Sequence, residues 1–248
     1  MIWRLAHEYQ SGAGYWQGTG PICLCRDRIP VDMLPELDEW TPKHFDDSLQ
    51  HPAVIAAASF TVLNESYNGD SDPNRLFIYT ARDTEGLIAW IDSPELRAAI
   101  EDGAERESKV LGVDGEPFTG NIYAVDQILT RHRDNPGRRL VAVERYEVPT
   151  EWDDRFGSWP NSRLLRISEH PGMRSVCTWT QKRDVPHRFP YDRYCSPGNR
   201  MLTVEIGAVG DNPADAMDAL LSGAEPWKQR LPYFRRDIAE QLMTRPST

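Results

Sequence analysis

His44 is the residue of this sequence best suited to chemistry, because an imidazole titrates near neutral pH and can accept and return a proton. Trp40 precedes it by four positions, so a helix would place both rings on one face, and an indole suits a flat apolar substrate. The pair predicts proton transfer at a carbon beside a carbonyl or an oxygenated ring. The alternative is that His44, flanked by Lys43 and near Asp46, covers a helix end in solvent.

The segment that carries His44 has a second copy later in the chain, and the same number of residues separates each pair of matching positions. Pro30, Trp40, His51-Pro52 and Phe60 recur without a gap as Pro149, Trp159, His170-Pro171 and Trp179. A repeat of this length is a whole small domain rather than a solenoid unit. His51 and His170 precede prolines, where helices end, and this favours a capping role over chemistry.

Arg163 occupies the position of His44 in the second copy. A permanent cation there would suit a carboxylate or an enolate, although a surface arginine is the equal alternative. Tyr79 and Tyr123 lie on expected strands and are either inward-facing hydroxyls or packing residues. We therefore take His44 as the catalytic candidate, and Trp40, Tyr79, Tyr123, Trp159 and Arg163 as substrate-binding candidates.

Hydrophobic periodicity predicts the same order of elements in both copies. In the first copy, strands are expected over 22–28, 54–63, 75–80 and 121–129, with helices over 31–50 and 93–102. In the second copy, strands are expected over 140–148, 174–180, 201–206 and 234–243, with helices over 150–168 and 213–221.

This β-α-β-β-α-β order predicts an α+β fold of two tandem ferredoxin-like units, each an antiparallel sheet with both helices on one face. The uncovered sheet faces would pack against each other, giving a barrel within one chain. The expected organisation is an N-terminal arm (1–20), a first domain (21–131), a linker (132–138) and a second domain (139–248).

A family resemblance enters with Trp40, His44 and the His51-Pro52 turn. This Trp-x-x-x-His helix followed by a proline turn resembles the EthD-like branch of the dimeric α+β barrel superfamily. The second copy matches at Trp159 and at Pro171-Gly172 but has Arg163 in place of the histidine. The resemblance implies a ligand cavity between sheet and helices. It fixes no reaction, because the superfamily includes isomerases, polyketide cyclases, cofactor-independent monooxygenases and haem enzymes.

Composition restricts the partners. The net charge of -10 and the lack of a Lys/Arg stripe disfavour nucleic acid, and no apolar run reaches the ~18 residues of a membrane span. We therefore expect a cytoplasmic protein with a small-molecule substrate, and a homodimer remains an option. Cys23 and Cys25 alternate on a strand, but a C-x-C pair alone indicates metal only weakly.

The function expected from these residues is cofactor-independent acid–base catalysis, as a lyase, isomerase or cyclase, on a small apolar, aromatic or polyketide-like molecule. One alternative is a cofactor-free monooxygenase of the same fold, and another is a non-catalytic ligand-binding or stress-response module. No metal is expected. Haem is the less favoured alternative, with His170 or His187 as its axial ligand.

Overall fold

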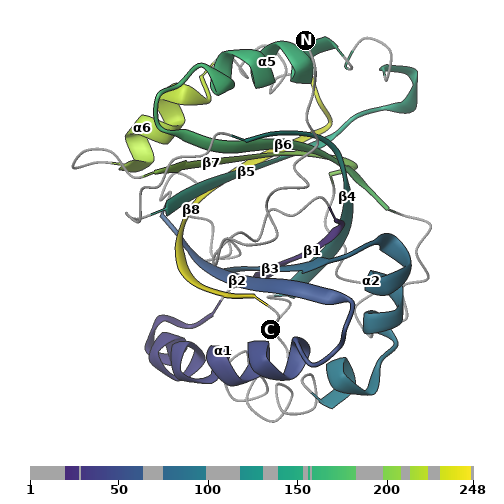
Figure 1. Ribbon diagram of the computed structural model, residues 1–248. Helices are drawn as coiled ribbons and strands as arrows, with labels where there is room; N and C mark the ends of the chain where they lie inside the picture. The colour runs from purple at the N-terminus through teal and green to yellow at the C-terminus, as the bar shows by residue number, and fades with distance from the viewer. Residues whose placement is uncertain are drawn as a thin grey trace.

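The computed structural model describes residues 20–27, 29–63, 75–98, 118–130, 139–152, 156, 158–182, 198–207, 213–222 and 230–246. These residues form eight antiparallel strands that close into a barrel in the order β1-β3-β2-β8-β5-β7-β6-β4. Helices lie outside the barrel on two opposite sides (Figure 1). We call residues up to 130 the first half and residues from 139 the second half.

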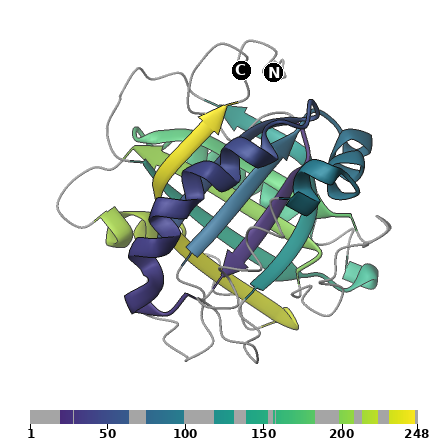
Figure 2. The same ribbon diagram turned by 90° about the horizontal axis from the view of Figure 1, so that it is seen from below.

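The first half consists of β1 (Ile22–Asp27), α1 (Leu34–Ser48), β2 (Val54–Val62), β3 (Arg75–Ala81), α2 (Thr84–Ile91) and β4 (Phe118–Thr130). A 3-10 turn, η2 (Val31–Met33), leads into α1, whose first turn contains Pro35. Proline is tolerated there because the first helical N–H groups have no partner within the helix. Figure 2 shows α1 crossing the outer face of the strands.

The second half consists of β5 (Arg139–Glu147), η4 (Thr150–Trp152), α5 (Ser158–Ser168), β6 (Met173–Gln181), β7 (Arg200–Gly207), α6 (Pro213–Leu220) and β8 (Tyr233–Pro246). The strand order β8-β5-β7-β6 repeats the order β4-β1-β3-β2 of the first half. Each half therefore contributes one four-stranded sheet with the same internal order.

Two long strands join the sheets into the barrel. β4 pairs with β1 over 118–123 and then with β6 over 123–130, and β8 pairs with β5 over 233–240 and then with β2 over 239–246. Both strands curve from one sheet to the other in Figure 1. Each has a bulge at the corresponding place, at Asp126 between Val125 and Gln127, and at Leu242 between Gln241 and Met243. A bulge bends its strand, which helps to close the barrel.

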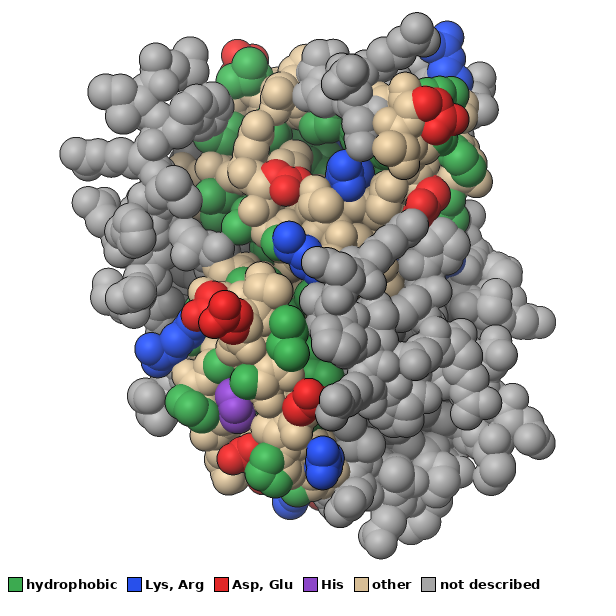
Figure 3. Space-filling model, turned by 90° about the vertical axis from the view of Figure 1, so that its right-hand side faces the viewer, with side chains coloured by type: hydrophobic (Ala, Val, Ile, Leu, Met, Phe, Trp, Pro, Cys, Tyr) green, Lys and Arg blue, Asp and Glu red, His purple; other side chains and the backbone are tan. Residues whose placement is uncertain are grey.

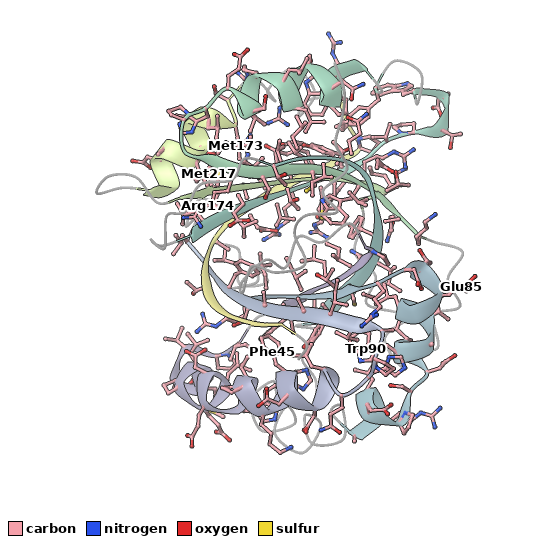
Figure 4. All side chains as sticks on the ribbon, viewed as in Figure 1. Phe45, Glu85, Trp90, Met173, Arg174 and Met217 are labelled. Carbon is pink, nitrogen blue, oxygen red and sulfur yellow. The ribbon has the colours of Figure 1, made fainter. Side chains whose placement is uncertain are left out.

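Three hydrophobic clusters hold this architecture together. One lies between α1, α2 and the first sheet and includes Phe45 and Trp90; a second lies under α5 and α6 and includes Met173 and Met217. Figure 4 shows these labelled side chains between helices and strands. The third fills the barrel interior, where Leu24, Phe60, Val143 and Trp179 meet from both sheets. The expectation that the two uncovered sheet faces bury each other is thus confirmed at the level of an α+β barrel.

One helix was not predicted from the sequence. α2 spans Thr84–Ile91, ahead of the helix expected over 93–102, whose described residues 94–98 are helical. Asp83 caps α2 by accepting the Gly86 N–H at 2.7 Å. A glycine in the first turn resembles a helix breaker in sequence. Here it is required by packing, because a Cβ on Gly86 would lie 2.7 Å from the Cβ of Ala53.

The arm at 1–20 lies outside the described residues except for Gly20, and so does the linker at 132–138. No described helix is long and apolar enough to cross a membrane. On the face in Figure 3, the described acidic and basic side chains are interspersed rather than gathered by sign. The described residues also contain no group of three or more His, Cys, Asp or Glu placed to hold a metal ion.

Candidate functional site

The structure brings together three of the sequence candidates in the first half. α1 packs on the outer face of β3, so that His44 Nε2 lies 2.7 Å from the Tyr79 hydroxyl. The Trp40 ring lies against His44 with centroids 4.3 Å apart. Trp40 and Tyr79 are buried, whereas His44 is half-buried. An imidazole bonded to a phenol in this way can exchange a proton with it.

Packing of aromatic rings surrounds this pair. Tyr79 contacts Trp90 of α2 at 5.1 Å and Phe45 of α1 at 5.8 Å, measured between ring centroids. Cys23 and Cys25 belong to the same cluster, with their Sγ atoms 3.8 Å apart. The His44–Tyr79 pair therefore lies within the helix–sheet core of the first half.

The equivalent place in the second half contains a buried ionic network. Arg163 of α5 forms a bidentate ion pair with Glu144 of β5 and donates to the Tyr146 hydroxyl at 3.0 Å. Arg236 of β8 also donates to Glu144, at 2.8 Å, and to Asp218 of α6, at 2.6 Å. The network thus connects α5, α6, β5 and β8.

Charge pairing controls protonation inside this network. Burial alone would raise the pKa of Glu144, but Arg163 and Arg236 outweigh it and hold that pKa below its usual value. Burial raises the pKa of Tyr146 well above its usual value, and the neighbouring carboxylate of Glu144 raises it further. Glu144 therefore stays ionised and Tyr146 stays protonated near neutral pH. Because Arg163 is already paired with Glu144, its charge stabilises the fold as much as it would stabilise a bound ligand.

A pocket of about 360 Å³ opens beside this network, between α5 and the outer face of the second sheet. Aromatic and apolar side chains make up most of its wall, and polar groups are placed among them. The lining residues are Asp126, Gln127, Tyr146, Phe156, Trp159, Pro160, Asn161, Arg163, Thr178, Trp179, Arg200, Met201 and Leu202. A concave site with aromatic walls and a few polar groups is the usual form of a small-molecule site.

Trp159 is held in the wall of this pocket by stacking. The Arg163 guanidinium lies over its ring at 4.8 Å, and Tyr146 and Phe156 contact it at centroid distances of 5.3 and 5.1 Å. Trp159 and Arg163 were both expected to bind substrate, and the structure places both at this pocket.

Asp126 is the carboxylate of the pocket, and the bulge in β4 positions it. Its Oδ2 accepts the Thr180 hydroxyl at 2.8 Å. The side chain stands exposed at the pocket mouth, yet the neighbouring walls remove enough water to raise its pKa above the usual value. The Thr180 hydrogen bond and the positive charge of Arg200 act in the opposite direction and moderate this rise. A carboxylate so placed can accept a proton from a bound molecule.

Tyr123 is the sequence candidate that lies apart from both groups. It is fully buried in the barrel interior, and its hydroxyl donates to the Gly198 carbonyl at 3.0 Å. Asp126 and Arg200 were not identified from sequence. No sequence signal distinguished Asp126, because only the strand pairing reveals the bulges at Asp126 and Leu242.

The described residues of the pocket do not fit a haem. Haem iron requires an axial ligand such as His, Cys, Met or Tyr. The pocket offers Tyr146, whose hydroxyl donates to Glu144, and Met201, which is buried in the barrel-interior cluster. His170 lies in the turn after α5, where its Nδ1 accepts the Gly172 N–H at 3.1 Å. His187 lies outside the described residues.

No protein-family model and no curated protein matches this sequence. Solved structures match the fold over nearly the whole chain. An anthrone oxidase-like protein superposes with a TM-score of 0.66 at 10% identity, over 94% of this chain and 95% of its own. A candidate monooxygenase from Fusobacterium nucleatum superposes with a TM-score of 0.60 at 10% identity, over 93% of this chain and 96% of its own. A candidate chlorite dismutase superposes with a TM-score of 0.50 at 12% identity, over 90% of this chain and 94% of its own. Such identities establish a shared α+β barrel fold and leave the reaction open.

Proposed function

We propose that this protein is a cofactor-independent enzyme that removes a proton from a flat aromatic molecule bound under α5, with Asp126 as the base. The observation that carries this proposal is a carboxylate of raised pKa at the mouth of an aromatic-walled pocket. A raised pKa brings the proton affinity of a carboxylate nearer to the working pH, which favours acid–base catalysis. A bound ligand would displace further water and strengthen this effect.

The carbanion or enolate formed by proton removal has two fates. Return of the proton at another atom gives isomerisation or cyclisation, whereas reaction with dioxygen gives an oxygenase. The second outcome is favoured, because fold neighbours are named as a monooxygenase and as anthrone oxidase-like. With anthrone as substrate, loss of a methylene proton to Asp126 and reaction with one dioxygen would give anthraquinone and one water.

Anthrone is therefore the first probe. Oxygen uptake and anthraquinone formation would be measured for the wild type and for Asp126→Asn, with Asp46→Asn as a matched control on the exposed face of α1. We expect Asp126→Asn to lower the rate by ~100-fold or more, the usual scale for a positioned base. The control should keep the wild-type rate. Equal rates for the wild type and Asp126→Asn would refute the assignment of the base.

His44 is the alternative base, supported by its contact with Tyr79 in the first half. His44→Gln separates the two centres in the same assay. Loss of turnover in His44→Gln with normal turnover in Asp126→Asn would move the reaction to the first half. Anthrone binding without oxygen uptake or product in any variant would favour the non-catalytic binding module.

We also propose that the halves descend from one duplicated ferredoxin-like unit of the EthD-like type, with domains at 21–131 and 139–248. The matching strand orders and bulges support this origin. His51 supports it too, because its Nδ1 accepts the Ala53 N–H just as His170 accepts that of Gly172. A homodimer remains a proposal that sedimentation can test.

A further inference from the structure

Four consecutive residues of β4 break the alternation of side chains that a regular strand has. Val125 and Ile128 pack against the barrel-interior cluster. Asp126 and Gln127, which lie between them, both line the pocket on the outer side of the sheet. Successive side chains of a strand point to opposite faces, so two neighbours on one face require an extra residue. The bulge at Asp126 supplies that residue, since Val125 and Gln127 pair with consecutive residues of β6.

The corresponding bulge in the other half has no polar pair. Leu242 is the extra residue of β8 and Met243 follows it, at the places where β4 has Asp126 and then Gln127. A bulge bends its strand by adding a residue to the backbone, whatever side chain that residue carries. Barrel closure therefore does not explain the carboxylate and the carboxamide of β4.

The two polar side chains of this bulge bring different chemistry to the pocket. Asp126 Oδ2 accepts the Thr180 hydroxyl at 2.8 Å, and this contact orients the carboxylate. Gln127 is exposed and lines the same pocket, and a carboxamide carries two N–H donors. Consecutive Cα atoms lie about 3.8 Å apart, so one small molecule can reach both side chains. The pocket thus has a proton acceptor beside a hydrogen-bond donor.

An enolisable ketone presents the complementary pair of groups. Its acidic C–H bond adjoins a carbonyl, and removal of the proton places negative charge on the carbonyl oxygen. A hydrogen-bond donor at that oxygen stabilises the charge as it develops. A second carboxylate there would repel it, so a carboxamide next to the base suits this step where a second acid would not.

Resting on the proposed function, we infer that Gln127 binds the carbonyl oxygen of an enolisable aromatic ketone while Asp126 takes the proton from the adjacent carbon. The C–H bond breaks, and its proton forms the O–H bond of the Asp126 carboxyl group. The electron pair of the C–H bond becomes the C=C bond of the enolate, and the π pair of the carbonyl group moves onto the oxygen. That oxygen accepts a hydrogen bond from Gln127 Nε2.

α-Tetralone and tetralin test this inference without turnover, because they share one ring frame and only the ketone has a carbonyl oxygen. Their affinities would be measured from the tryptophan fluorescence of the wild type and of Gln127→Met, which keeps the side-chain length and removes the amide. We expect Gln127→Met to weaken α-tetralone binding by about 3- to 10-fold, the range for one neutral hydrogen bond. Tetralin binding should stay unchanged. Anthrone turnover should fall further than α-tetralone affinity, because the oxygen carries more charge in the enolate than in the ketone.

Gln50→Met is the matched control, since Gln50 is an exposed glutamine that follows α1 in the first half, and it should leave both affinities unchanged. Equal effects of Gln127→Met on the two ligands, or no binding of α-tetralone to the wild type, would overturn the inference. The anthrone assay answers separately. Loss of turnover in Asp126→Asn with normal turnover in Gln127→Met would keep the base and discard the role of Gln127. Normal turnover in Asp126→Asn with a selective loss of α-tetralone binding in Gln127→Met would refute the base and keep the ketone site.

Discussion

Replacing Glu144 with glutamine removes the negative charge that Arg163 and Arg236 share in the second half. Glu144 is fully buried, and the two arginines are 4% and 3% exposed. Glutamine keeps the size of the side chain, so the change acts through charge rather than through a cavity. Removing one partner of a buried ion pair costs about 3–5 kcal/mol, because the remaining charge stays buried without compensation. This is a large part of the ~5–15 kcal/mol that stabilises an ordinary domain.

Urea unfolding at neutral pH measures this cost through a lower midpoint at an unchanged slope. Asp218→Asn is the control in the same network. Asp218 also binds Arg236, but its side chain is 61% exposed, so we expect a loss of no more than about 1 kcal/mol. A Glu144→Gln protein as stable as Asp218→Asn would refute the view that this carboxylate holds the second half together.

The pH dependence of the same variant gives an independent check. The pKa of Glu144 is lower in the folded state than the usual value of 4.5, so its stabilisation is fully present above that value. It is lost as the pH falls below 4.5 and through the folded-state pKa. The stability difference between the wild type and Glu144→Gln should therefore shrink in acid.

Three further results are expected. Tyr79→Phe should cost about 0.5–1.5 kcal/mol in urea unfolding, because it removes the hydrogen bond to His44, and it should leave anthrone turnover unchanged; altered anthrone turnover would link the two halves. Gly86→Ala should lower stability in thermal unfolding by about 1–3 kcal/mol, since its Cβ would collide with that of Ala53, and an increase in stability would contradict this packing. Asp126→Asn should become more stable relative to the wild type as the pH rises above 3.8, because the raised pKa of Asp126 means that folding disfavours its charged form; an opposite trend would show that its pKa is lowered.

Apart from α2, the sequence predicted the order of elements, because matching residues in the two copies indicated the same element at the same place. Trp40, Trp159 and the two His-Pro turns fixed the register of the halves, and alternation of apolar residues located the strands. The ends of β4 and β8 were harder to predict, because these strands continue past their own sheet to pair with the other half. Such pairing depends on barrel closure, which local periodicity does not encode.

The candidate site was predictable only in part. The helix positions of Trp40, His44, Trp159 and Arg163 follow from periodicity, and the structure places them against the outer sheet faces as expected of helix residues. The bulge at Asp126 is a property of strand pairing, which a single strand does not reveal. The partner of Arg163 was equally hidden, since Glu144 resembles an ordinary polar residue until β5 and α5 are packed together.

The two halves place their polar contacts between helix and sheet differently on the same arrangement of strands. At the position of Arg163 in the second half, the first half has His44, whose imidazole contacts the Tyr79 hydroxyl, whereas Arg163 pairs with the Glu144 carboxylate. At the position of Asp38 in the first half, whose carboxylate accepts from Arg75, the second half has Gly157. Ion pairs therefore join helix to sheet at different places in the two halves. Asp38 pairs with Arg75 in the first half, whereas Arg163 pairs with Glu144 and Asp218 with Arg236 in the second. The Arg163–Glu144 ion pair lies beside the pocket, and Asp126 lines the same pocket, where a ligand can reach its carboxylate.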